Sequence, residues 1–114
     1  MSHTVTVVIR EDPQRSHRAV EALRIALGLG AGEDQLAVML LDQAPALLSD
    51  DRDNIVDVDI LEKYLPSFQH LGTEFLVAPG AGAAFTLEEG LTVRELPVLE
   101  LQRRIVSSDR VLVF

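Results

Sequence analysis

The stretch TVTVVI, residues 4–9, decides the fold because it is a continuous, β-branched and largely apolar run. A strand with one face in water alternates polar and apolar residues, whereas a strand buried on both faces reads as an unbroken run. This run therefore predicts a central strand of a parallel sheet. The run QLAVMLL, residues 35–41, has the same character and predicts a second buried strand.

Helical patterns separate the predicted strands. Residues 10–16 supply turn chemistry, and Ser16 is placed to cap a helix that the apolar positions predict over residues 17–29. A second helical pattern covers residues 59–72, and Pro66 inside it should kink or interrupt the helix. The stretch QAPALLS, residues 43–49, predicts a helical turn between them.

The rest of the chain continues the alternation of strands and helices. Such alternation implies right-handed crossovers and a sheet that is covered on both faces. The sequence therefore predicts one α/β domain over residues 1–114, with three α/β/α layers and a mainly parallel five-stranded sheet. The further elements predicted are strands over 73–78, 91–96 and 109–114, and helices over 83–90 and 97–108.

Composition excludes several classes of function. The 114 residues include no cysteine, which removes disulfides, thiolate nucleophiles and cysteine-based zinc sites. His3, His17 and His70 show no metal-ligand spacing, so we expect no metal and no cofactor. The net charge of -8 argues against nucleic acid. With no apolar run near the roughly 20 residues of a membrane span and no signal pattern, we expect a cytoplasmic protein without a membrane partner.

Acidic residues are concentrated between residues 33 and 62, beginning at Glu33, and only Arg52 opposes them in that segment. The N-terminal third is more basic, so complementary charges on two loops could set subunit register or partner choice. The alternative is a solvated loop that keeps the protein in solution. The run DDRDNIVDVD, residues 50–59, lacks the turn glycine of a calcium loop and is interrupted by Ile55 and Val56, which favours the solvated loop.

Candidate binding residues follow from the parallel sheet, because ligands lie beyond the carboxyl ends of its strands. The turn PGAGAAFT, residues 79–86, has the geometry of an anion-binding turn but lacks the lysine of a nucleotide loop, so close packing and anion binding are both open. His17 is the best titratable group near that edge. Ser16, His17 and Asp12 do not suggest a triad, whose members converge from separate elements. The candidates are Arg10, Asp12, His17, Pro79, Gly80, Ala81 and Gly82.

Six stretches together resemble a known family over nearly the whole chain. They are VTVVI, HRAVEALRIALGL, LAVMLLDQA, YLPSFQHLG, FLVAPGAGAAFTLEEGL and the terminal SSDRVLVF. The layout is similar to the DsrE/DsrF/DsrH-like sulfur-relay proteins, which include the TusB, TusC and TusD subunits, and is nearest the DsrF/TusC branch. The resemblance implies a Rossmann-like sheet, a cytoplasmic location, and a trimer or hexamer, as a homo-oligomer or as a hetero-oligomer with paralogous subunits.

The same resemblance locates a reactive cysteine in the family at or just after the end of the third strand. The matching window here, Val77 to Gly82, reads VAPGAG and holds no nucleophile. A persulfide is carried by a thiolate, so this chain cannot relay sulfur through that position.

Three hypotheses follow. A non-catalytic DsrE-like subunit or scaffold predicts a large apolar contact, for which the weakly charged segment 75–87 is the candidate. A module that binds a small anion or a partner's segment predicts a pocket of backbone donors at residues 79–86, next to the 10–17 loop. An enzyme using His17, Asp12 or Arg10 predicts His17 hydrogen-bonded to a carboxylate inside that pocket.

Overall fold

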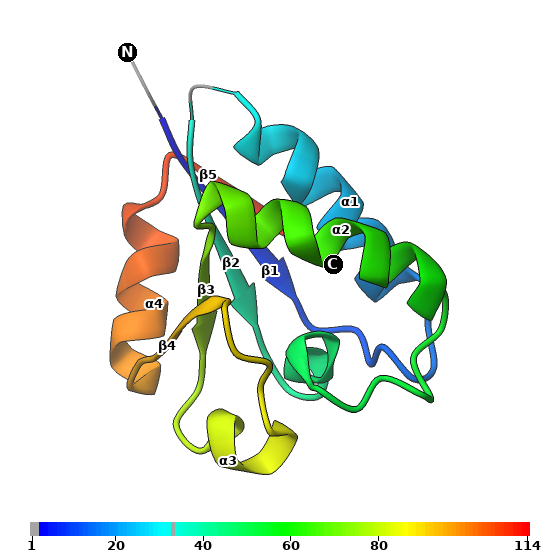
Figure 1. Ribbon diagram of the computed structural model, residues 1–114. Helices are drawn as coiled ribbons and strands as arrows, with labels where there is room; N and C mark the ends of the chain where they lie inside the picture. The colour runs from blue at the N-terminus through cyan, green and yellow to red at the C-terminus, as the bar shows by residue number, and fades with distance from the viewer. Residues whose placement is uncertain (1–2, 33) are drawn as a thin grey trace.

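The five predicted strands form one sheet in the computed structural model, which describes residues 3–32 and 34–114 (Figure 1). All neighbouring strands pair in parallel, in the order β4-β3-β2-β1-β5, so the predicted fold class is confirmed. Glu33, at the start of the predicted acidic segment, lies outside the described residues. The strands are β1 (Thr4–Ile9), β2 (Gln35–Leu40), β3 (Glu74–Val77), β4 (Thr92–Glu95) and β5 (Arg110–Val113).

Helices cover both faces of the sheet, but unequally. The two longest helices lie together on one face, one shorter helix lies on the other, and a five-residue helix lies beyond the carboxyl ends of the strands (Figure 1). None of the helices in the described residues combines the length and apolar character needed to cross a bilayer. The helices are α1 (Arg18–Gly30), the 3-10 helix η1 (Ala44–Leu48), α2 (Val58–Leu71), α3 (Ala81–Phe85) and α4 (Val98–Ser107).

The larger core lies between the sheet and the α1–α2 layer. Leu23 of α1 and Phe68 of α2 pack there against strand side chains such as Val38 and Phe75. The rings of Phe68 and Phe75 meet edge to face, with centroids 5.4 Å apart and an interplanar angle of 70°. The other face holds a much smaller core of Val8, Ala37, Met39, Leu76 and Leu101, of which only Leu101 comes from α4.

Two local predictions need correction, namely an interruption of the second helix at Pro66 and the bounds of the helix predicted over 83–90. Pro66 does not interrupt the second helix, because α2 runs from Val58 to Leu71 without a break. Proline has no backbone N–H, so Pro66 leaves the Glu62 carbonyl without its intrahelical donor. Both residues are exposed, so water can donate to that carbonyl instead.

The helix predicted over 83–90 instead spans Ala81 to Phe85. The backbone that follows pairs with η1, because the Glu88 amide donates to the Leu48 carbonyl at 2.7 Å and Leu87 bridges Ser49. A tertiary backbone contact therefore replaces the last turns of the predicted helix.

Candidate functional site

The strand connections locate the crevice in which a parallel sheet can hold a ligand. The chain leaves β1 and β2 towards the α1–α2 face, but it leaves β4 towards α4 on the opposite face. A crevice opens where neighbouring connections diverge to opposite faces. In the order β4-β3-β2-β1-β5 the strand order reverses between β1 and β5, because α1 follows β1 on one face and α4 precedes β5 on the other. A hollow of about 320 Å³ lies there, lined by Arg10, Glu11, Asp12, Asp42, Val113 and Phe114.

The side chain of Glu95 closes on the turn after β3. Its Oε1 accepts a hydrogen bond from the backbone N–H of Gly82 at 2.8 Å, and a Cβ on Gly82 would lie only 2.9 Å from that oxygen. Gly80, with φ of 88°, provides the left-handed turn that leads into this segment. The sequence predicted the turn correctly, but its donor already holds the chain's own carboxylate.

The candidate residues do not all converge on one site. Arg10 and Asp12 share the hollow between β1 and β5, where Arg10 pairs with Asp42, with Nε and Oδ2 3.8 Å apart. Asp12 also lines another hollow, to which Pro79 and Gly80 do not contribute. His17 is exposed, and its side chain makes no hydrogen bond within the described part of the chain. The arrangement required by the enzyme hypothesis is therefore not present.

The hollow between the 10–17 loop and the end of α3 has a volume of about 270 Å³ and is lined by Asp12 on one side and Thr86 on the other. Backbone hydrogen bonds hold its walls, because the Asp50 amide donates to the Thr86 carbonyl at 3.1 Å. The carboxylates of Asp12, Asp50 and Asp51 line it, which disfavours an anion and favours a cationic group. Nowhere in residues 3–32 and 34–114 do three or more acidic or histidine side chains come together in a way that could hold a metal ion.

Backbone strain also gathers at this edge. Asp42, Asp57 and Thr86 have φ values of 57°, 62° and 47°, and they are the described non-glycine residues in the left-handed region. Such a conformation is costly for a β-branched residue like Thr86, and it persists only where the surroundings enforce it. The hydrogen bond from Asp50 to the Thr86 carbonyl is one such restraint.

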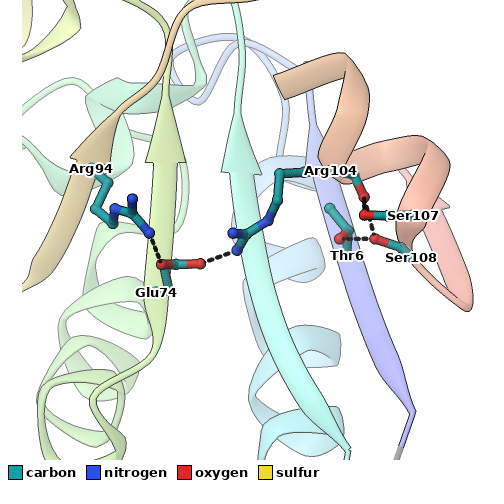
Figure 2. A network of polar contacts seen from close by, with 6 residues as sticks. All are labelled: Thr6, Glu74, Arg94, Arg104, Ser107 and Ser108. Carbon is teal, nitrogen blue, oxygen red and sulfur yellow. Dashed lines mark hydrogen bonds and ion pairs between the residues drawn. The ribbon is translucent and has the colours of Figure 1, made fainter. Parts of the chain in front are cut away.

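A further cavity, of about 340 Å³, lies at the amino-terminal ends of β1, β2 and β3, beneath the end of α4. Figure 2 shows the polar network on its wall, in which Glu74 accepts from Arg94 at 2.9 Å and also binds Arg104. Ser108 donates to the Arg104 carbonyl at 2.6 Å, so the buried Thr6 must donate in the 2.6 Å bond between the two hydroxyls. Because these charges and hydroxyl protons are used internally, the network anchors α4 to the sheet.

The sequence reasoning missed both Glu95 and this network. Glu95 follows a predicted strand, but its contact with Gly82 depends on the β3–β4 register, which no local pattern reveals. Thr6 and Ser108 are 102 residues apart, and Glu74 and Arg104 are 30 apart. The only local signal was polar side chains in segments predicted to be strands or a covering helix.

Replacing Glu95 with alanine tests its contact with Gly82. We expect a loss of about 0.5–1 kcal/mol in the free energy of unfolding, because the bond is charge-assisted but exposed. The Gly82 amide resonance should shift in a ¹⁵N–¹H spectrum. Glu89→Ala, an exposed glutamate on the neighbouring turn, is the control, and equal losses for both variants with an unmoved Gly82 resonance would contradict the contact.

Comparisons with known proteins bear on the fold alone. No family model matches the sequence, and no curated protein matches it. The structure is similar to the crystal structure of the ychN protein from E. coli, with a TM-score of 0.76 and 20% sequence identity over the whole of both chains. The ychN protein has a DsrE/TusB-like fold. The five-stranded parallel sheet with helices on both faces is therefore a DsrE-like fold.

Proposed function

We propose that this chain is a non-catalytic DsrE-like subunit or scaffold that acts through contacts with other subunits and is associated with sulfur-relay or sulfur-metabolism partners. The observation that carries the proposal is the turn after β3. In the family that the sequence resembles this turn holds the thiol, whereas here it holds no nucleophile and Glu95 occupies its backbone donor. A chain with this fold and no reactive atom at that turn retains its surfaces as the means of action.

The partners in this proposal are further copies of the chain, in a trimer or hexamer, or paralogous DsrE/DsrF-like subunits that carry the thiol, in the cytoplasm. The segment 75–87 does not supply the apolar contact predicted from the sequence, because Phe75, Leu76 and Val77 are fully buried inside the subunit. Large exposed apolar side chains gather elsewhere, on α4 and β5. Val98, Leu99 and Val106 lie on α4, and Val113 lies on the same side of β5. Leu112 of β5 faces the other side of the sheet, and α2 exposes Ile60 and Leu71.

The proposal is tested by mixing the purified chain with a cysteine-bearing DsrE-like protein from the same genome and a persulfide donor. We expect a stable complex by light scattering, with sulfur found by intact mass on the partner and never on this chain. A chain that forms no complex with any such partner, or that itself turns over a substrate, would overturn the proposal.

The second candidate is a binding module, and one observation favours a particular form of it. The hollow of Asp12, Asp50 and Asp51 is acidic, so a basic peptide segment suits it better than the small anion considered from the sequence. Titration with a short arginine-containing peptide should then shift the resonances of Asp12 and Thr86, and inorganic phosphate should leave them unchanged. The reverse result would restore the anion.

A further inference from the structure

Helix α4 buries very little of its apolar surface within the subunit. It has ten residues, of which only Leu101 is buried, whereas α1 buries five. Val98, Leu99 and Val106 are 59%, 56% and 86% exposed. Helices shorter than about 12–15 residues depend on tertiary packing for their stability. The amount of packing that α4 receives from its own subunit is small.

The cause of this exposure is visible in the polar network (Figure 2). The side of α4 that faces the sheet carries Arg104 and is followed by Ser108, and these residues bind Glu74 and Thr6. Polar anchors on the inner side leave Leu99 and Val106 on the outer side. Leu101 and Ile105 pack against the sheet as in an ordinary surface helix, and Leu99 and Val106 form a second apolar side, as in a helix between two layers.

We propose that α4 packs against α4 of a second copy of this chain, as an antiparallel pair about a two-fold axis. This inference rests on the proposed function, because it names one partner and one surface for the subunit contacts. Three observations support it, namely the spacing of the apolar side chains, the charge of the surrounding surface and the continuation of the apolar face onto β5.

The spacing makes the stripe complementary to itself. Leu99 and Val106 are seven residues apart and so lie on the same side of the helix. In an antiparallel pair whose axis passes between Gln102 and Arg103, Leu99 of each copy meets Val106 of the other. A shallow groove of about 480 Å³ along α4, lined by Leu99, Gln102, Arg103, Val106 and Ser107, provides the space for these contacts. An isologous interface needs this match of a surface with itself.

Charge favours this surface over the rest of the molecule for contact between identical chains. Two copies with a net charge of -8 repel each other. Residues 94–114 carry four arginines and three acidic residues, whereas residues 1–93 carry six basic and fifteen acidic residues. Contact through α4 therefore joins nearly neutral surfaces. Glu100 and Arg103 are already paired at 2.7 Å within the helix, so pairing adds no unpaired charge beside the stripe.

The apolar face extends beyond the helix. A groove of about 370 Å³ between α4 and the edge strand β5 is lined partly by Ile105, Val111 and Val113, and Val113 is 61% exposed. An interface over α4 and this groove is larger than a single helix provides, and it buries the exposed Val113 of β5. Specific interfaces need such breadth.

Val106→Asp tests the surface. Sedimentation or light scattering should show that the wild type self-associates. The dissociation constant of the variant should be at least about a hundredfold higher, because a carboxylate would be buried against leucine. Ile60→Asp, on the exposed side of α2, is the matched control and should associate like the wild type. Circular dichroism should be unchanged in both variants, since both positions are exposed. A wild type that is monomeric, or an equal effect of the two substitutions, would overturn the inference.

Cross-linking tests the register, and the absence of native cysteine makes it clean. We expect an equal mixture of Leu99→Cys and Val106→Cys chains to form the mixed disulfide dimer under mild oxidation, in large excess over either homodimer. A dominant Leu99→Cys homodimer would mean parallel packing and would overturn the antiparallel pair.

Loss of binding to a different protein, with no change in self-association, would likewise overturn the second copy as occupant. The proposed function fails on a separate measurement, namely binding to the cysteine-bearing partner and the location of its sulfur.

Discussion

Phe75→Ala is expected to lower the free energy of unfolding by about 3–5 kcal/mol. Phe75 is fully buried in β3 and meets Phe68 of α2 edge to face, so truncation removes apolar burial, leaves a cavity and breaks an aromatic pair. The whole free energy of unfolding of a domain is about 5–15 kcal/mol, so this variant should be close to unfolding at room temperature. Urea denaturation followed by circular dichroism measures the loss.

Phe85→Ala is the control for this prediction, because Phe85 is only half-buried at the edge of the same core. It should cost clearly less than Phe75→Ala. A double-mutant cycle between Phe68 and Phe75 should yield a coupling of about 0.5–1.5 kcal/mol. Equal losses at Phe75 and Phe85, with no coupling to Phe68, would mean that α2 does not dock on β3 as described.

Glu74→Gln is expected to lower the free energy of unfolding by about 1–2 kcal/mol, which lies between the losses typical of exposed and of buried ion pairs. The Glu74 side chain is 26% exposed and accepts from both Arg94 and Arg104, so the change leaves two neighbouring guanidinium groups without a counter-charge. Because Arg104 lies on α4, the loss should also loosen the attachment of that helix to the sheet. Urea denaturation measures the loss of stability.

The control is Glu62→Gln, at an exposed position of α2. Amide exchange at Ser107 and Ser108 should accelerate in Glu74→Gln and remain unchanged in Glu62→Gln. Arg104→Met should couple to Glu74→Gln in a double-mutant cycle. Additive effects of those two substitutions would mean that the carboxylate does not anchor α4.

The fold was predictable because its information is local. TVTVVI and QLAVMLL read as strands buried on both faces, and they became β1 and β2 at the centre of the sheet. The errors arose where the surroundings changed the outcome, through solvent in one case and through a segment distant in sequence in the other. Water around exposed Pro66 tolerates a missing hydrogen bond, and η1 captures the backbone after α3.

The candidate site was predictable only in part. The edge and the turn at residues 79–86 followed from strand order and glycine spacing. The filling of that turn by Glu95 did not, because it depends on how β4 aligns with β3. The acidic lining contributed by Asp50 and Asp51 was visible as charge, but its position beside Asp12 depends on a loop that folds back over the edge.

The contact between Glu95 and Gly82 has a consequence for introducing a reactive thiol at this turn. A Gly82→Cys substitution would place its Cβ 2.9 Å from a carboxylate oxygen, so the new side chain would have to displace or crowd that group. A nearby negative charge raises the pKa of a thiol, and a thiol that stays protonated is a poor nucleophile. A working thiolate at this turn would therefore require a change at residue 95 as well, so the unreactive character of the turn depends on two positions.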